Sequence, residues 1–330
     1  MNWTLPELMQ FAGSYWGVCA LHTGVKLNVF SQLEEKSLDA AAVAGLCDTD
    51  ARATGLLLDA LAALGLVTKS GELYDLTTFS RNHLVRSAPG YMGHIIMHHH
   101  HLMPSWAKLP DAVRSGGPVG VSSSHANDEE TRESFLMGMF NLASQLAPLV
   151  AAKVDLTGRR RLLDLGGGPG TYAVHFCLQN PELSATIFDL PTSRSFAEGV
   201  VNRFGLSERI NFAGGNFDHD DLPRGFDAVW ISHILHSEDK DDCLTLLCKA
   251  VDALEPGGLL LVQDFLLNDE KDSPLFPALF SLNMLVGTPH GRSYSKGELG
   301  AMMTSAGLCD IRIVELNLPN GAGLLVGVKP

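Results

Sequence analysis

The chain has 330 residues, of which 45% are apolar and 18% charged, a composition typical of a globular protein with room for two domains. The formal net charge of −13 argues against a general nucleic-acid or anionic-membrane binder, because such surfaces need clustered Lys and Arg. No basic segment followed by a long apolar run opens the chain, and its six cysteines form no C-x-x-C pair. These features predict a cytoplasmic protein with reduced cysteines and no membrane association.

The first part of the chain is predicted to be mainly helical. Residues 37–67 are rich in Ala and Leu with helical periodicity and predict two helices, and residues 69–71 lie in a short hairpin signal. Helix, helix and hairpin is the winged-helix order, so residues 1–90 are predicted to form one domain. Residues 91–150 are predicted to be further helices with a Gly/Ser-rich loop at 115–128.

From about residue 160 the chain alternates between strands and helices, and residues 151–330 are predicted to form a second domain. This alternation predicts an α/β fold with a Rossmann-like, doubly wound sheet, mostly parallel with an antiparallel C-terminal strand. The predicted strands are RRLLDL, LSATIFDLP, RINFAGGNF, FDAVWISHILH and GGLLLVQDFLL, followed by the pair DIRIVELN and GAGLLVGVKP, with helices at 171–179, 193–204 and 241–254.

The stretch LLDLGGGPGTYA predicts a ligand-binding turn between a buried strand and a helix. Gly166, Gly168 and Gly170 permit positive φ angles and a close backbone approach to a ligand, and the helix that follows offers free N–H groups and a positive dipole end. The glycines match neither the dinucleotide pattern G-x-G-x-x-G nor a phosphate loop. Asp164, directly before the turn, would repel a pyrophosphate but attract a cationic amino group, which favours a ligand with an amino acid moiety.

Further polar residues follow the next two predicted strands. Asp189 ends the second strand, 25 residues after Asp164, where an acidic residue accepts hydrogen bonds from ribose hydroxyls. Asn216 and Phe217 end the third, where they are suited to an adenine edge and an adenine face. Because ligands bind at the carboxyl ends of strands in open α/β sheets, these residues are expected to converge on one site.

The motifs LLDLGGGPGTYA, IFDLP, GGNF, ISHILHSEDKDDC and LEPGGLLLVQD resemble those of S-adenosylmethionine-dependent O-methyltransferases with an N-terminal winged-helix dimerisation domain. This family includes plant phenolic, acetylserotonin-type and bacterial polyketide enzymes. The resemblance implies S-adenosylmethionine as cofactor, S-adenosylhomocysteine as product, a homodimer formed through the N-terminal domain, and a small-molecule acceptor. It also implies a set of cofactor-binding residues: Asp164, Gly166, Gly168, Asp189, Leu190, Asn216, Phe217, Ser232 and His233.

Methyl transfer to oxygen requires in-line placement and removal of the acceptor's proton. The family motif that carries the base appears here as SHILHSEDKDD, so the resemblance places the general base at His236. The carboxylate that orients the base in relatives corresponds to Asp264, 28 residues later. His233 is expected to be structural or adjacent to the cofactor.

Three positions depart from the family pattern. Ser237-Glu238 replaces Asp-Trp after the base, and Asn216 replaces an adenine-binding Asp. Ser293 stands where plant relatives have a second carboxylate. The acceptor is therefore a phenol or, given these departures, a more acidic carboxylate or thiol. A related enzyme that uses the cofactor for hydroxylation or decarboxylation remains an alternative.

The resemblance places the wall of the acceptor pocket in residues 91–150 and in the segment after the fifth strand. The predicted substrate-binding residues are His94, His98, His101, Met137, Phe140, Asn141, Phe280, Asn283, Met284 and His290. In a helix over 91–103, three of the histidines share one face at positions i, i+4 and i+7, and burial would keep them neutral. We expect them to line the acceptor pocket and expect no metal, with packing, dimer contact and metal binding as alternatives.

A protein of another class is a second hypothesis: a regulator whose winged helix binds DNA while its C-terminal domain senses a metabolite. The predicted recognition helix at 48–66 carries Arg52 as its single cation. Because a recognition helix needs several polar and cationic side chains aimed at base edges, dimerisation is the favoured role of this domain.

Overall fold

The computed structural model describes residues 3–120, 129–314, 316 and 318–330. The chain divides into two compact units, the first made of Met1–Leu102 with Glu133–Asn141 and the second of Met103–Arg132 with Leu142–Pro330. Part of the predicted Gly/Ser-rich loop, residues 121–128, lies outside the described residues. We describe each unit separately below.

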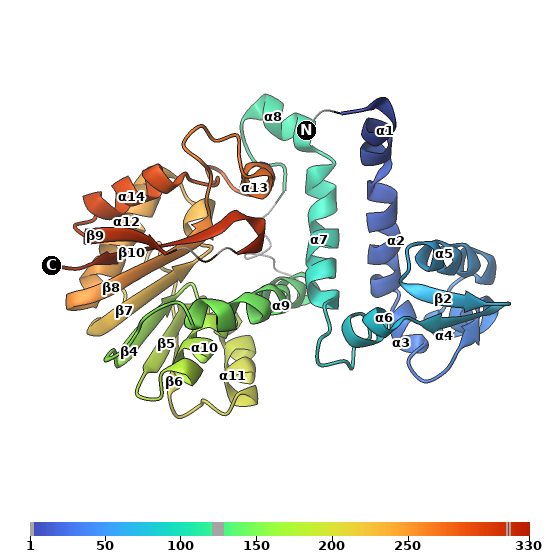
Figure 1. Ribbon diagram of the computed structural model, residues 1–330, viewed down its shortest axis with the longest axis horizontal. Coiled ribbons are helices and arrows are strands. Elements are labelled where there is room, and N and C mark those ends of the chain that lie inside the picture. The colour runs from blue at the N-terminus through green and yellow to red at the C-terminus, as the bar shows by residue number, and fades with distance from the viewer. Residues whose placement is uncertain (1–2, 121–128, 315, 317) are drawn as a thin grey trace. The chain divides into compact units, whose positions relative to one another are not determined.

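The first unit contains the predicted succession of two helices and a hairpin (Figure 1). Asp39 and Asp50 begin the two helices as N-caps, each accepting a backbone N–H bond of 2.8 Å from the residue three positions on. The elements are α1 (Leu5–Gly13), α2 (Tyr15–Lys26), α3 (Val29–Gln32), β1 (Leu38–Asp39), α4 (Ala40–Cys47), α5 (Ala51–Ala63), β2 (Val67–Ser70), β3 (Leu73–Leu76) and α6 (Thr78–His83). Phe30, Leu58 and Leu61 are buried at the centre of its core.

Two helices contribute residues to both units. Helix α7 (Gly93–Trp106) contains the histidine run and extends three residues beyond the predicted end, through Pro104. Helix α9 (Glu129–Ala151) is long and apolar enough to cross a membrane by length and composition alone. Core helices of globular proteins can have the same length and apolar composition. Leu136 and Val150 are buried, which fits a helix of the protein core.

The second unit is built on a seven-stranded sheet with strand order β6-β5-β4-β7-β8-β10-β9 (Figure 1). Strands β6, β5, β4, β7 and β8 run parallel, and β10 is antiparallel to both β8 and β9, which confirms the predicted fold class. The strands are β4 (Arg161–Leu165), β5 (Ser184–Asp189), β6 (Ile210–Gly214), β7 (Phe226–Ser232), β8 (Leu254–Phe265), β9 (Cys309–Val314) and β10 (Ala322–Val328).

Helices connect these strands at the predicted places. The chain runs outward from β4 to β6, returns to β7 beside β4, and then runs outward in the other direction. Right-handed crossovers therefore place the helices of the two halves on opposite faces of the sheet. The helices and turns are α8 (Leu109–Ser115), α10 (Thr171–Gln179), η2 (Pro191–Ser193), α11 (Arg194–Arg203), η3 (Leu235–Ser237), α12 (Lys240–Ala253), α13 (Leu275–Gly287), α14 (Lys296–Ser305) and η4 (Pro319–Gly321).

One carboxylate joins several of the segments beyond the carboxyl edge of the sheet. Oε1 of Glu298 pairs with Lys240 at 3.2 Å, Lys271 at 2.8 Å and Arg292 at 3.0 Å. Its Oε2 accepts the N–H of Ser295 at 3.0 Å, which closes a capping box at the start of α14. These bonds outweigh the effect of burial and lower the pKa of Glu298 to about 2.

We expect Glu298→Gln to lower the free energy of unfolding by about 2 kcal/mol, because three cations lose one shared carboxylate. The folded-state pKa is depressed, so this stabilisation is complete above pH 4.5, the ordinary value, and is lost as the pH falls toward 2. Urea titrations at pH 7 test the effect. Glu182→Gln is the control, because the Glu182 side chain is 77% exposed in its pair with Arg160, and an equal loss in both variants would contradict the special role of Glu298.

Candidate active site

The Gly-rich turn joins β4 to α10 and depends on residues without side chains. Gly166, Gly168 and Gly170 have φ angles of 67°, 52° and 73°, the left-handed region that glycine adopts at little cost. A Cβ on Gly166 would lie 2.4 Å from Cδ1 of Ile234 and 3.7 Å from the ring of Phe217. The turns after β4, β6 and β7 therefore meet at this glycine.

The buried carboxyl group of Asp164 packs against the Gly-rich turn and bonds to the helix that follows it. The side chain is 2% exposed, and its Oδ2 accepts the N–H of Ala173, in the first turn of α10, at 3.2 Å. Gly167 lies directly over the carboxyl group, since a Cβ there would come 2.7 Å from Cγ of Asp164. Burial raises the pKa of Asp164 to about 7, so the carboxylate form needs a cationic partner to be favoured at neutral pH.

Asp189, at the end of β5, ties the second loop to the Gly-rich turn. Its Oδ2 accepts the N–H of Gly168 at 2.8 Å, and its Oδ1 accepts the N–H of Leu190 and the hydroxyl of Ser193, both at 2.7 Å. A carboxylate has about four acceptor positions, so one position on Oδ2 remains for a ligand hydroxyl. Burial raises the pKa of Asp189.

The loop after β6 is fixed by its own hydrogen bonds and by a lysine. The N–H of Asn216 donates to Asp220 at 2.7 Å, and its side-chain Oδ1 accepts the N–H of Asp218 at 2.9 Å. The ammonium of Lys249, on α12, donates to the carbonyls of Phe217, Asp218 and Asp220 at 2.7, 3.3 and 3.1 Å. Sequence reasoning did not single out Lys249, because its partners are backbone atoms.

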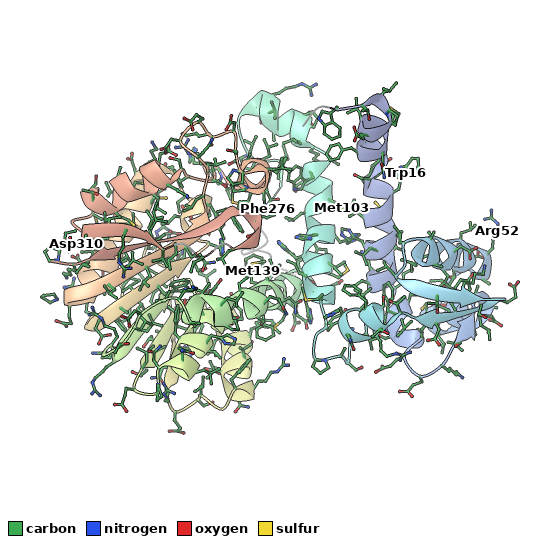
Figure 2. All side chains as sticks on the ribbon, viewed as in Figure 1. Trp16, Arg52, Met103, Met139, Phe276 and Asp310 are labelled. Atoms are coloured by element: carbon green, nitrogen blue, oxygen red, sulfur yellow. The ribbon has the colours of Figure 1, made fainter. Side chains whose placement is uncertain are left out.

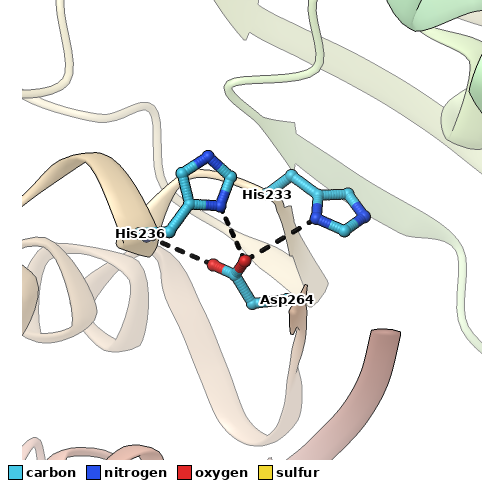
Figure 3. A group of neighbouring side chains, drawn as sticks. All are labelled: His233, His236 and Asp264. Carbon is cyan, nitrogen blue, oxygen red and sulfur yellow. Dashed lines mark hydrogen bonds and ion pairs between the residues drawn. The ribbon is translucent and has the colours of Figure 1, made fainter. Parts of the chain in front are cut away.

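His236 and Asp264 form a buried pair at the ends of β7 and β8 (Figure 3). Nδ1 of His236 lies 2.7 Å from Oδ1 of Asp264, and the backbone N–H of His236 donates to Oδ2 at 3.2 Å. Burial opposes the charge on Asp264, but the two neighbouring imidazoles outweigh it and hold the pKa of this carboxyl well below its usual range. An ionised carboxylate only accepts hydrogen bonds, so Nδ1 carries the proton and Nε2 is left as the basic atom.

His233 faces the same carboxylate from a strained position. Its φ is 57°, a left-handed value that is uncommon outside glycine, and its Nδ1 lies 3.6 Å from Oδ1 of Asp264. The carbonyl of Gln263 accepts its backbone N–H at 2.9 Å, and the Gln263 amide Nε2 lies 3.4 Å from its Nε2. Gln263 also donates to Oη of Tyr172 at 3.0 Å, which connects this loop to α10.

One group of three side chains in the described part of the chain has the spacing of a metal site: His233, His236 and Asp264. The nitrogen and oxygen atoms with which they could coordinate a metal ion lie within 4.8 Å of one another. A metal ion would have to replace the 2.7 Å hydrogen bond between His236 and Asp264. The observed bond instead matches a carboxylate that orients an imidazole. The histidines of α7 form no such group among the residues that the structure describes.

Three phenylalanines from β8 and α13 pack beside the histidines. The ring of Phe280 meets His236 edge-on at 4.7 Å between centroids, and the ring of Phe265 lies 4.3 Å from His233. Phe276, labelled in Figure 2, completes the set at 4.9 Å from Phe265. Of these three, only Phe280 was predicted from the sequence as a site residue. The i, i+4 spacing of Phe276 and Phe280 on one helix could have indicated that Phe276 lies beside it.

A buried thiol supports the turn that carries His236. Cys243, on α12, is fully buried, and its Sγ lies 3.1 Å from the carbonyl oxygen of Leu235. Burial raises the pKa of Cys243 to about 12, so the thiol stays protonated and donates to this carbonyl. Tyr294 fixes the other side of the turn by donating to the carbonyl of Glu238 at 2.7 Å.

Six predicted acceptor-binding residues lie in the first unit: His94, His98, His101, Met137, Phe140 and Asn141. His98 packs edge-on against Phe135 at 5.4 Å, and His94 against Tyr91 at 5.3 Å. Burial lowers the pKa of His94, and that of His98 to about 4, so both are neutral near pH 7, as expected. Nδ2 of Asn141 donates to the carbonyl of Tyr91 at 2.8 Å, and its buried Oδ1 has no hydrogen-bond partner among the described residues.

The other four predicted acceptor-binding residues lie in the second unit. Phe280, Asn283 and Met284 belong to α13, and His290 is exposed in the segment that follows it. That segment packs against the turn of His236, since a Cβ on Gly291 would lie 2.6 Å from the carbonyl oxygen of His236. The hydroxyl of Ser293, which replaces a carboxylate of the family pattern, is buried without a described hydrogen-bond partner. Ser232 ends β7 in register with Gln263.

Comparison with known proteins places the chain in a family. Residues 106–309 match the model of the O-methyltransferase domain, and residues 9–86 match the O-methyltransferase dimerisation domain. The chain is 35% identical to 3-hydroxy-5-methyl-1-naphthoate 3-O-methyltransferase of Streptomyces sahachiroi, over 98% of this chain and 94% of that protein. It is 32% identical to the tetracenomycin polyketide synthesis 8-O-methyl transferase TcmO of Streptomyces glaucescens, over 98% and 96% of the two chains.

Solved structures agree with this assignment. Human N-acetylserotonin methyltransferase, solved in complex with SAM, matches with a TM-score of 0.88 and 27% identity, over 100% of this chain and 98% of that one. The chain therefore belongs to the O-methyltransferase family. This membership confirms the family, enzyme class and S-adenosylmethionine dependence predicted from the motifs.

We expect Gly167→Ala to weaken S-adenosylhomocysteine binding by at least about tenfold, because the new methyl group collides with the Asp164 carboxyl and displaces the turn. Calorimetry of the purified protein measures this affinity. Gly199→Ala on α11 is the matched control, since nothing lies within 4 Å of its Cβ and alanine favours a helix. Unchanged affinity in Gly167→Ala would contradict the packing described for the turn.

Proposed function

We propose that this O-methyltransferase methylates the hydroxyl group of an aromatic small molecule, with His236 as general base and Asp264 as the residue that orients it. The 2.7 Å bond between them carries the proposal, because it leaves Nε2 of His236 available to accept the acceptor's proton. When bound, S-adenosylmethionine supplies the methyl group: the acceptor oxygen bonds to the methyl carbon as the carbon–sulfur bond breaks, leaving S-adenosylhomocysteine. The carboxylate stabilises the imidazolium formed in this step.

The residues of the turns fit this cofactor. Asp164 is a buried carboxyl that needs a cationic partner, and the cofactor's amino group is one. Asp189 retains an acceptor position suited to a ribose hydroxyl. We assign the adenine to the loop of Asn216 and Phe217, and the remaining contacts to Gly166, Gly168, Leu190, Ser232 and His233.

The phenylalanines beside the histidines favour an aromatic acceptor. Aromatic rings pack edge-on or offset against one another, so Phe265, Phe276 and Phe280 offer a planar ring system a wall next to the base. The names of the two Streptomyces relatives specify a hydroxynaphthoate and a polyketide. We therefore propose a phenolic hydroxyl on a fused-ring compound over the carboxylate and thiol alternatives.

The dimerisation domain supports a homodimer as the working form. Helices α1 and α2 of the first unit expose a series of large apolar side chains suited to burial by a second copy. The most exposed of them are Leu5, Met9, Phe11, Tyr15 and Trp16. Arg52 remains the one cation on α5 (Figure 2), so DNA recognition has little support. The free cysteines suit the proposed cytoplasmic location.

We expect His236→Ala to lower the turnover of a naphthol acceptor by about a hundredfold or more, since proton removal by a positioned base contributes on that scale. Affinity for S-adenosylhomocysteine should stay within about twofold, because the imidazole acts on the acceptor. Asp264→Asn should also lower turnover, by releasing the imidazole's orientation. Mass spectrometry of the product separates methylation from hydroxylation or decarboxylation, and full turnover in His236→Ala would refute the assignment.

We expect cofactor binding to release a proton from Asp164. Its pKa of about 7 means that the carboxyl is largely protonated at about pH 6, and a cationic amino group shifts it to the carboxylate. Affinity for S-adenosylhomocysteine should therefore rise as the pH increases from about 5.5 to 7. Calorimetry in two buffers of different ionisation enthalpy measures the release. Asp164→Asn should bind S-adenosylhomocysteine more weakly and without releasing a proton. If the wild type releases no proton on binding, Asp164 has only a structural role.

A further inference from the structure

Two imidazoles face one carboxylate oxygen at the end of the sheet (Figure 3). Oδ1 of Asp264 lies 2.7 Å from Nδ1 of His236 and 3.6 Å from Nδ1 of His233. The first contact is a hydrogen bond, whereas the second is too long for one. Nδ1 of His233 is buried and has no hydrogen-bond partner among the residues that the structure describes. A second ring nitrogen therefore faces the carboxylate without being bonded to it.

The three atoms are close to the separations that a transition-metal ion imposes on its ligands. Zn²⁺ binds imidazole nitrogen and carboxylate oxygen at about 2.0–2.2 Å, which places tetrahedral ligand atoms about 3.4 Å apart. The 3.6 Å between His233 and Asp264 is already near this value, and all three atoms lie within 4.8 Å of one another. The bond of His236 to Asp264 has to lengthen by a fraction of an ångström. Two imidazoles with one carboxylate suit Zn²⁺ and its neighbours, whereas Mg²⁺ and Ca²⁺ prefer oxygen ligands.

The backbone fixes two of these ligands independently of the bond that an ion would replace. The N–H of Phe265 donates to Oδ1 of Asp264 at 2.8 Å, and the N–H of His236 donates to Oδ2 at 3.2 Å. His233 is fixed by its own N–H, which donates to the carbonyl of Gln263 at 2.9 Å. Its side chain is 23% exposed, which gives an ion a way in from solvent. The ring of His236 is thus the single ligand that has to move.

The amide of Gln263 offers the outer partner that a metal-bound imidazole needs. A histidine that binds a metal through Nδ1 carries its proton on Nε2 and donates it to a neighbouring oxygen. Nε2 of the amide lies 3.4 Å from Nε2 of His233 and 3.0 Å from Oη of Tyr172, and no described group bonds to its Oε1. Half a turn of the amide exchanges its oxygen and nitrogen. Oε1 then accepts the N–H of His233 and the hydroxyl of Tyr172.

We propose that His233, His236 and Asp264 form a binding site for a divalent transition-metal ion such as Zn²⁺, and that the bound ion switches off the base. Coordination through Nδ1 moves the proton of His236 from Nδ1 to Nε2. Nε2 is then a donor and has no lone pair for the proton of an acceptor. The ion and the bond between His236 and Asp264 therefore exclude each other. The metal site goes beyond the proposed function, and its inhibitory effect rests on that function.

Calorimetric titration of ZnCl₂ into the full-length protein, freed of metals by a chelator, tests the site. The exposed thiols of Cys248 and Cys309 also bind Zn²⁺, so every protein compared carries serine at both positions. The protein with His233 and Gln263 intact should bind one ion per chain at this site. His233→Asn should weaken this binding at least tenfold, by roughly the scale of one lost ligand contact. Asparagine also tolerates the left-handed backbone of this position, where φ is 57°. Gln263→Met, which removes the amide, should weaken binding by about tenfold.

The visible absorption of bound Co²⁺ reports the ligand geometry, since four-coordinate sites absorb more strongly than six-coordinate ones. His99→Asn removes an exposed imidazole of α7 and is the control, with Zn²⁺ affinity expected to be unchanged. Unaltered thermal stability without metal shows that each variant is folded. Absence of Zn²⁺ binding, or equal affinity with and without the His233→Asn and Gln263→Met changes, would overturn the inference.

Methyl transfer to a naphthol separates this inference from the proposed function. Saturating Zn²⁺ should lower turnover by about a hundredfold, the scale expected for loss of the base, and a chelator should restore it. His233→Asn should require about tenfold more Zn²⁺ for half inhibition. Binding at the three residues without loss of turnover would refute the switch. A protein that binds Zn²⁺ there but methylates no naphthol would refute the aromatic acceptor and leave the metal site standing.

Discussion

The pairing of His236 with Asp264 depends on the register of neighbouring parallel strands. Strands β4, β7 and β8 are hydrogen-bonded neighbours, and Ser232 at the end of β7 pairs with Gln263 of β8. Successive side chains of a strand point to opposite faces, so Gln263 reaches Tyr172 of α10 while Asp264 reaches His236. A slip of one residue would exchange the two faces and place the amide, instead of the carboxylate, beside the imidazole.

The carboxylate of Asp264 is buried among groups that favour its charge. Backbone N–H groups of His236 and Phe265 and the imidazole of His236 all donate to it, and His233 lies within 3.6 Å. Burial alone would neutralise an isolated carboxyl, so these donors are what keep the charge in place. The apolar rings of Phe265 and Phe280 pack beside His236 in the same region, and the low polarity of these surroundings strengthens each of these interactions.

The sequence was most informative where local patterns decide the structure. The strand and helix alternation after residue 160 predicted the sheet, and the glycines with Asp164 and Asp189 predicted turns that the structure brings together. One helical face predicted a shared role for His94 and His98, and this role stays a prediction; their ring contacts, with Tyr91 and Phe135, could not be predicted from the helical periodicity. Contacts such as that of Trp106 with Asn283 join residues 177 positions apart, and no local pattern signals them. The roles of the predicted site residues remain predictions.

The burial of the Cys243 thiol behind the turn of His236 has a consequence for its reactivity. A sulfonium methyl donor alkylates any sufficiently strong nucleophile, and a thiolate is a far stronger one than a phenol. Cys243 lies on α12, the helix that follows the turn of His236, yet its pKa of about 12 and its bond to the carbonyl of Leu235 keep it a neutral thiol. Burial behind the turn of His236 thus keeps this one thiol from competing with the acceptor for the methyl group.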